Sequence, residues 1–227
     1  MNSQIIPTIF SQSKEEFLNR FNLLSKFAPS IQIDVMDGKF VNNTSIPLSD
    51  IPNLKKIKNK FEVHLMVYHP EKYIEKLSSK GFKKIIFHIE SYTDQEGKSV
   101  QRLIEKIKSQ NIQAFIAINP ETPLERILPY VSSTDGILFM GVHPGKEHKS
   151  FIPEVYKKIK KLKTFNKSII VQVDGGVSPN NIDQLANIDA DILNTGSYVS
   201  DSKNPIQAFK ILDNLFKKAK SKKRGKQ

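Results

Sequence analysis

The chain has 227 residues and contains no cysteine, which excludes disulfides, thiolate metal ligands and a cysteine nucleophile. It has no run of 18 or more apolar residues, so we expect no membrane-spanning helix and no membrane partner. Residues 1–11 lack the basic start and long apolar centre of a secretory signal. We therefore expect a cytoplasmic protein.

A glycine-rich dinucleotide motif is also missing, because no Gly-x-Gly-x-x-Gly follows the first apolar run. Short runs rich in Ile, Val and Phe alternate instead with helical patterns. This alternation predicts a parallel sheet with crossover helices, closed into a single (β/α)8 TIM barrel of the α/β class. We place the barrel at residues 1–216, with a loop and a short helix at 38–59. The strands are predicted at 5–10, 31–35, 61–67, 84–89, 112–118, 136–140, 169–173 and 191–194, and the helices at 15–27, 71–80, 99–110, 153–163, 180–186 and 205–218.

Acidic residues are absent from the last segment, 217–227, which carries seven basic residues and so holds more than half of the net charge of +12. We predict a disordered, solvated tail here. Nucleic acid is not the expected partner, because the tail has no aromatic residue on which bases could stack. The basic body of the chain would help to attract a phosphorylated substrate.

Three residues that can carry chemistry stand where predicted strands end: Asp34, His64 and Asp174. The carboxyl ends of barrel strands converge on one mouth, so these side chains are expected to meet there. Two carboxylates can act as acid and base on opposite faces of one carbon, and a divalent metal ion between them can polarise a carbonyl. Taken singly, each residue could equally have a structural role. Asp34 could cap a turn, Asp174 could begin a Gly-Gly turn, and His64 could be a buried core histidine.

Small residues and methionines also gather at strand ends. Gly175, Gly176, Gly196 and Ser197 follow the last two strands, where barrel enzymes usually bind phosphate. The alternative is that they are ordinary turn residues. Three of the four methionines also end strands, where they would line an apolar patch near the reacting carbon or fill the core. They are Met36, Met66 and Met140.

Six motifs in order resemble the ribulose-phosphate 3-epimerase family over residues 4–212. The resemblance implies a barrel that interconverts ribulose 5-phosphate and xylulose 5-phosphate, with Asp34 and Asp174 as the acid/base pair. It also implies one divalent metal ion, such as Zn, Fe or Mn, held by those aspartates and His64. Thr8, His64 and Gly145 would contact substrate, and a homo-oligomer is expected. The motifs are Pro7-Thr8-Ile9, 34–41, 64–67, 87–90, 140–145 and 173–177.

Three departures from the family pattern stand out. Gln32 occupies the place of a histidine metal ligand and can offer its amide oxygen to the metal, but this oxygen is a poor zinc ligand beside imidazole. Metal affinity should therefore fall, and preference should shift toward Mn²⁺ or Mg²⁺. In the phosphate loop, Glu147 and His148 replace two glycines, while Lys146 and Lys149 add charge. His143 near the same mouth is a candidate substitute ligand.

The leading interpretation is therefore a metal-dependent 3-epimerase of ribulose 5-phosphate working through an enediolate. A second is a 3-epimerase of a six-carbon ketose phosphate such as allulose 6-phosphate, suggested by the altered loop. A third, suggested by Gln32 and the missing glycines, is a catalytically weakened barrel that only binds phosphosugars.

Overall fold

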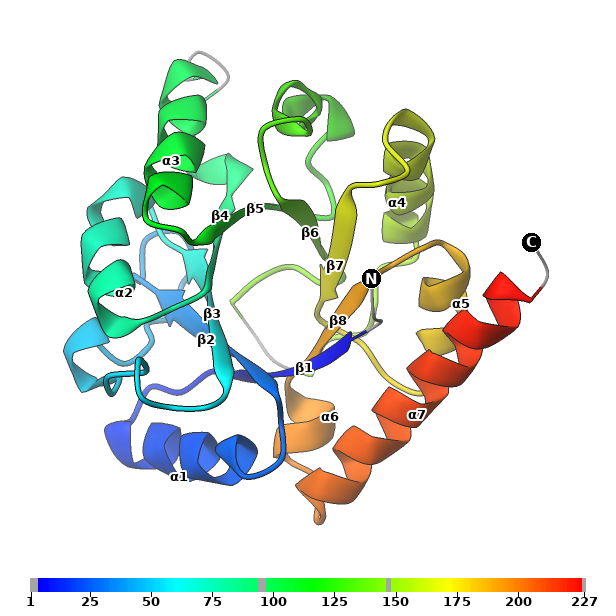
Figure 1. Cartoon of the computed structure of the whole chain (residues 1–227), viewed down its shortest axis with the longest axis horizontal. Helices are drawn as coiled ribbons and strands as arrows, with labels where there is room; N and C mark the ends of the chain where they lie inside the picture. Colours follow the sequence, from blue (N-terminus) through cyan, green and yellow to red (C-terminus); the bar gives the residue numbers. More distant parts are fainter. Residues whose placement is uncertain (1–3, 94–96, 146–147, 226–227) are drawn as a thin grey trace.

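A computed structural model describes residues 4–93, 97–145 and 148–225, and eight parallel strands close into one barrel in chain order (Figure 1). The first strand pairs with both the second and the last, which completes the ring. The predicted TIM barrel is thus confirmed, and each predicted strand lies within two residues of an observed one. The strands are β1 (Gln4–Ile9), β2 (Ser30–Met36), β3 (Lys60–Met66), β4 (Lys84–His88), β5 (Gln113–Ile118), β6 (Gly136–Met140), β7 (Ile170–Asp174) and β8 (Ile192–Thr195).

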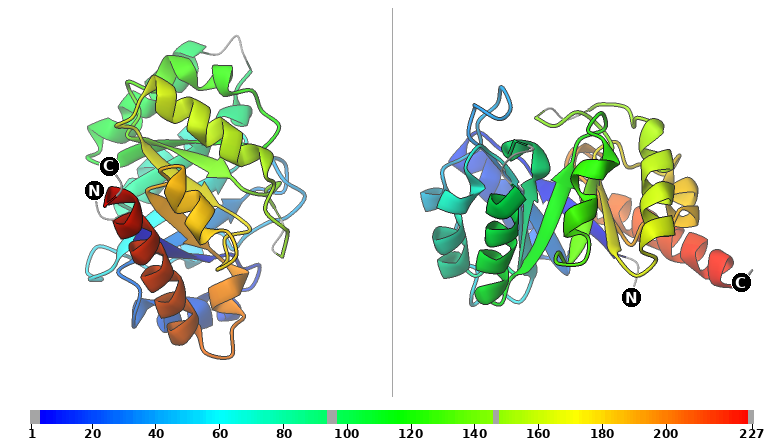
Figure 2. Two further views of the ribbon diagram at one scale, coloured as in Figure 1. Left: turned by 90° about the vertical axis from the view of Figure 1, so that its right-hand side faces the viewer. Right: turned by 90° about the horizontal axis from the view of Figure 1, so that it is seen from above.

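Helices surround the ring of strands on the outside, as the views from two further directions also show (Figure 2). Short 3-10 turns replace a full helix after β2 and after β5. No helix in the described part of the chain is long and apolar enough to cross a bilayer. The helices are α1 (Lys14–Ser25), α2 (Ile74–Lys80), α3 (Gly97–Ser109), α4 (Glu154–Phe165), α5 (Ile182–Asn187), α6 (Ser197–Ser200) and α7 (Pro205–Arg224), and the 3-10 turns are η1 (Leu48–Asp50), η2 (Pro70–Lys72), η3 (Ile89–Ser91), η5 (Leu124–Arg126) and η6 (Leu128–Tyr130).

Alternation along each strand decides which side chains enter the barrel. On β2, Ile31, Ile33 and Val35 belong to the large apolar core of the molecule. The residues that alternate with them, Gln32, Asp34 and Met36, carry an amide, a carboxylate and a thioether, because successive side chains of a strand point to opposite faces. A separate apolar cluster inside the barrel is supplied mainly by β4, β5 and β6, and comprises Ile86, Phe115, Ala117, Leu138, Met140 and Val142.

The prediction of a disordered tail from residue 217 is wrong for residues 217–224, because α7 continues through Arg224. The helix packs against α5 and β1, and Ala219 is buried one turn after the buried Phe216. Lys223 forms an ion pair with Asp189. An apolar stripe at helical spacing therefore orders a segment whose charge composition indicated a solvated tail.

Gly136 provides room for an aromatic ring inside the barrel. A Cβ at this position would overlap the ring of Phe115 and lie 2.9 Å from the carbonyl oxygen of Ile170. The ring of Phe115 is fully buried, and the ammonium of Lys84 lies 4.4 Å from its centroid. Any side chain at 136 must push this ring or the backbone of β7 away.

We predict that Gly136→Ala lowers the free energy of unfolding by about 1–3 kcal/mol through overpacking. Urea unfolding followed by circular dichroism measures the change. Gly225→Ala is the matched control, because the nearest atoms to a Cβ there are 3.8 Å away. Equal stability of the two variants would contradict this account of the barrel interior.

Candidate active site

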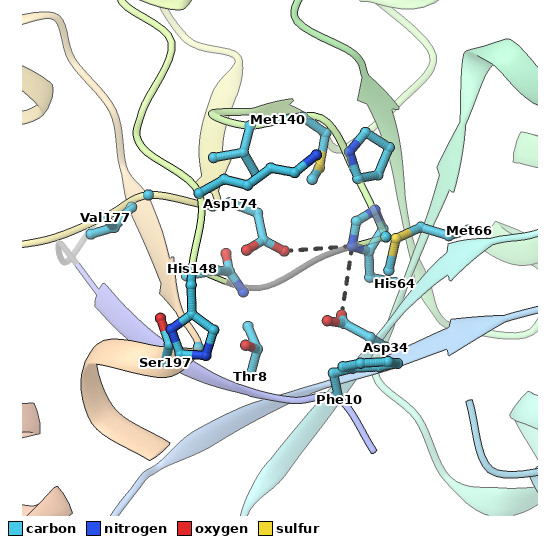
Figure 3. A pocket seen from close by; sticks show the side chains of 18 of the residues that line it. Thr8, Phe10, Asp34, His64, Met66, Met140, His148, Asp174, Val177 and Ser197 are labelled. Atoms are coloured by element: carbon cyan, nitrogen blue, oxygen red, sulfur yellow. Dashed lines mark ion pairs between the residues drawn. The ribbon is translucent and has the colours of Figure 1, made fainter. Parts of the chain in front are cut away.

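The three residues singled out at strand ends meet at the carboxyl end of the barrel. Asp34 on β2 stands directly opposite His64 on β3 in the parallel register. Asp174 ends β7 and reaches the same point from the other side of the ring. Figure 3 shows the three side chains pointing toward one another. The imidazole Nδ1 of His64 lies 3.6 Å from Asp34 Oδ1 and 3.5 Å from Asp174 Oδ2.

Gln32 lies beneath this cluster and is fully buried. Its amide nitrogen donates hydrogen bonds to Asp34 Oδ1 at 2.8 Å and to Asp174 Oδ2 at 2.6 Å. Its amide oxygen faces away and accepts a hydrogen bond from the side chain of Asn194 at 2.9 Å. The residue at the family ligand position thus presents a donor, and not an oxygen ligand, to the two carboxylates.

A second hydrogen-bonded chain holds His64 from the opposite side. The Nε2 atoms of His64 and His88 are 2.9 Å apart, and His88 Nδ1 is 2.9 Å from a carboxylate oxygen of Glu90. Burial lowers the pKa of His88 and keeps its ring neutral. Burial alone would raise the pKa of Glu90, yet the bond from His88 outweighs it and the pKa falls to about 2.

These ionisation states define the tautomers. An ionised Glu90 accepts a hydrogen bond from the Nδ1–H of His88, so His88 Nε2 carries a lone pair and accepts a hydrogen bond from the Nε2–H of His64. The Nδ1 atom of His64 is left facing the two aspartates. Among the described residues it has no hydrogen-bond partner, although it is buried.

A cation fits this arrangement of donor atoms. Two ligands held about 2.1 Å from one tetrahedral ion are about 3.4 Å apart, which is close to the observed imidazole–carboxylate distances. One ligand atom from each of Asp34, His64 and Asp174 lies within 4.8 Å of the others. A metal ligand histidine also needs its second nitrogen to donate to a fixed partner, and His88 supplies one. The cluster is a possible three-residue metal site.

Without a cation, a proton takes its place. Burial alone would lower the pKa of His64, but the carboxylates of Asp174 and Asp34 outweigh burial and raise it to about 9. Burial, together with the charge of Asp174, raises the pKa of Asp34 to about 6, against the opposing effect of His64. The site therefore holds positive charge between two carboxylates in either state.

The remaining predicted site residues line one pocket together with this cluster. The lining includes Thr8, Met36, Met66, Met140, Gly145, Gly175, Gly176, Gly196 and Ser197. In Figure 3, Ser197 and His148 lie on the side of the pocket away from Met66. Gly176 has a φ of 67°, and a Cβ there would lie 2.8 Å from the backbone of Phe151. Because residue 176 has no side chain, the backbone of Phe151 can approach this turn closely.

Three candidates fall outside this arrangement. His143 is 57% exposed and pairs with Glu121 at 3.2 Å, and it does not join the cluster. Lys146 and Glu147 lie outside the described residues, so the predicted effect of their charges remains a prediction. His148 and Lys149 of the same loop do line the pocket, and His148 pairs with Asp201 at 3.4 Å.

Three residues that support the cluster from below and behind were not predicted as site residues from the sequence. His88 and Glu90 were part of a family motif but received no role. Asn194 was assigned only to a strand. The available signal was a polar residue inside an otherwise apolar strand, since buried polar side chains need partners.

A closed (β/α)8 barrel with a buried aspartate–histidine cluster in the pocket at its carboxyl end defines a barrel enzyme. Residues 4–200 match the Ribulose-phosphate 3 epimerase family, and the chain belongs to this family of isomerases. A ribulose-phosphate 3-epimerase from Schizosaccharomyces pombe is 34% identical over 98% of both chains. The cytoplasmic isoform of Oryza sativa is 33% identical over 80% of both, and the Bacillus subtilis enzyme 31% identical over 91% of this chain and 98% of its own.

Solved structures of low identity share the fold. KGPDC from Streptococcus mutans has a TM-score of 0.71 at 11% identity, covering 96% of this chain and 98% of its own. A 3-hexulose-6-phosphate synthase has a TM-score of 0.69 at 14% identity, covering 93% and 99%. At these identities the similarity concerns the barrel alone.

We predict that Glu90→Gln weakens divalent-cation binding by about 10–100-fold, the usual effect of losing a partner behind a metal ligand. Glu90 accepts from both His88 and the backbone N–H of Asn119, and an amide can accept at only one of its two ends. Competition with a fluorescent chelator measures the affinity. Glu105→Gln, on the exposed face of α3, is the control. A change below threefold would contradict the proposed hydrogen-bond chain.

Proposed function

We propose that this protein is a metal-dependent ribulose 5-phosphate 3-epimerase, in which Asp34 and Asp174 exchange protons with C3 of the sugar. The observation that carries the proposal is the convergence of these two carboxylates on one buried point from opposite sides of the barrel mouth. Epimerisation requires an acid and a base on opposite faces of one carbon. Two such groups on β2 and β7 meet that requirement.

The side chains around the pair support an enediolate reaction. One aspartate takes the C3 proton, and the other returns a proton to the opposite face. His64 and Gln32 hold the two carboxylates in place through contacts of 2.6–3.6 Å. A bound divalent ion, held by Asp34, His64 and Asp174, would supply Lewis-acid stabilisation of negative charge on the C2 and C3 oxygens. With one imidazole and two carboxylates as ligands, Mn²⁺ and Mg²⁺ are reasonable ions beside Zn²⁺ and Fe²⁺.

The opposite side of the pocket suits the substrate phosphate. Gly175, Gly176, Gly196 and Ser197 line the pocket, and the three glycines have no side chain that would cover their backbone. Backbone N–H groups of this kind bind phosphate in many barrels. Lys149 adds a positive charge to the same lining. Three methionines also line the pocket and would keep water away from the reacting carbon.

We predict that Asp174→Asn lowers epimerase turnover by about 10²–10⁴-fold while substrate still binds, because one of the two proton-transfer groups is lost. Asp34→Asn should behave alike. Conversion of ribulose 5-phosphate, and deuterium uptake from D2O at C3, are followed by NMR with Mn²⁺ or Zn²⁺ present. Asp183→Asn on α5 is the control. Full turnover by Asp174→Asn would exclude the two-aspartate mechanism.

We predict a higher kcat/KM for ribulose 5-phosphate than for a six-carbon ketose phosphate such as allulose 6-phosphate. The reason is that the relative from Schizosaccharomyces pombe, which matches 98% of the chain, is named for ribulose phosphate, a five-carbon sugar. Parallel assays with both sugars decide between them. A preference for six carbons would assign the second substrate class. Binding without any deuterium exchange would indicate a barrel that only binds phosphosugars.

A further inference from the structure

Below the catalytic pair, a chain of buried polar side chains runs through the interior of the barrel. It links β2, β3, β4, β7 and β8, and every member has at most 7% of its surface exposed. Its members are Gln32, Glu62, Lys84, Gln172 and Asn194. Neither the acid/base reaction nor the three-residue cation site uses the lower four of them.

The lower end of the chain is an ion pair. Lys84 Nζ donates to Glu62 Oε2 at 2.7 Å and to the amide oxygen of Gln172 at 3.0 Å. The amide nitrogen of Gln172 then donates to Glu62 Oε1 at 2.5 Å and to the amide oxygen of Asn194 at 2.7 Å. A lysine ammonium can only donate, and an ionised carboxylate can only accept. The two charged groups therefore fix which way the amide of Gln172 faces.

The orientation of the Gln172 amide in turn fixes the orientation of the Asn194 and Gln32 amides above it. The nitrogen of Asn194 donates to Glu62 Oε1 at 3.1 Å and to the amide oxygen of Gln32 at 2.9 Å. Gln32 is left with its two N–H bonds pointing at the aspartates. Turning any one amide over places donor against donor on one side and acceptor against acceptor on the other. Turning all three places donor against donor at Lys84 and acceptor against acceptor at Glu62.

We propose that Gln32 is a positioning residue that donates hydrogen bonds to both catalytic carboxylates, and that Lys84 and Glu62 hold its amide in this orientation through Gln172 and Asn194. It follows that Gln32 gives no oxygen to a cation, so that the metal site has three protein ligands. The inference rests on the cation site of the proposed function and not on the identity of the sugar.

The direction in which metal affinity changes when Gln32 is replaced shows whether Gln32 is a hydrogen-bond donor or a metal ligand. Gln32→Met keeps the length of the side chain and removes the amide. If Gln32 is a donor, its loss frees carboxylate lone pairs, and the affinity for Mn²⁺ and Zn²⁺ in chelator competition stays within threefold or becomes tighter. If Gln32 is an oxygen ligand, the affinity falls by tenfold or more, which would overturn the proposal. Gln113→Met, at the exposed start of β5, is the matched control.

Breaking the chain tests the relay itself. Asn194→Leu removes the donor that holds the oxygen of Gln32, so that this amide can turn its oxygen toward the cation. Metal affinity should then rise by about threefold or more, and Gln32→Met added to Asn194→Leu should remove that gain. An affinity within twofold of the unmodified protein in Asn194→Leu would show that the chain does not set the orientation.

Neutron diffraction from deuterium-exchanged crystals of the unmodified protein examines the same point without any variant. We expect two deuterons on the Gln32 atom that faces the carboxylates, with or without Mn²⁺. An oxygen there would overturn the proposal even if the variants fail to fold. Failure of the unmodified protein to bind Mn²⁺ or Zn²⁺ would count against the metal-dependent reaction, whereas the deuterons would still decide the role of Gln32.

Discussion

The close approach of two carboxylates inside the barrel mouth is the constraint on which the rest of the site depends. Asp34 and Asp174 both lie within hydrogen-bond distance of one amide nitrogen, and their side chains are only 13% and 11% exposed. Like charges at such a distance and depth are costly unless positive charge or donors surround them. His64 from one side, Gln32 from below and a proton or cation in the centre meet that need. The same close approach brings two carboxyl groups, which can accept and donate protons, to one place.

Two hydrogen-bonded chains end at the pair of aspartates, and their donors and acceptors run in opposite directions. The chain that begins at Glu90 starts from an acceptor and ends at His64 Nδ1, which would offer a lone pair to a cation that displaces its proton. The chain that begins at Lys84 starts from a donor and ends in the N–H bonds of Gln32. Each chain takes its direction from a charged residue that has only one hydrogen-bonding role. A lone pair can bind a cation and an N–H cannot, which is why we propose three protein ligands, without Gln32, for the possible cation site.

The sequence was sufficient to predict the barrel, because Ile- and Val-rich runs mark strands buried on both faces. It was also sufficient to predict that the two aspartates meet, because the ends of barrel strands converge. The sequence was not sufficient to predict the hydrogen-bonded chain of polar side chains below the aspartates. Glu62 and Lys84 looked like ordinary charged residues, and their pairing depends on which interior positions of β3, β4 and β7 share a level once the ring closes. It also misjudged the end of α7, where the burial of Ala219 against the body of the protein outweighs the charge of its neighbours.

Gln32 replaces the histidine that the family resemblance implies as a metal ligand. Its hydrogen bonds favour a site that has adapted to this residue over one that is losing its function. A buried polar group that has lost its partner costs about 1–3 kcal/mol, so a site drifting away from function would accumulate such groups. Gln32 instead uses both N–H bonds and its oxygen, and Asn194 does the same beneath it. In the cluster that the structure describes, the buried atom without a partner is His64 Nδ1. This is the atom that would bind a divalent ion in the proposed site, and the bond between the other ring nitrogen and His88 fixes the orientation of the ring.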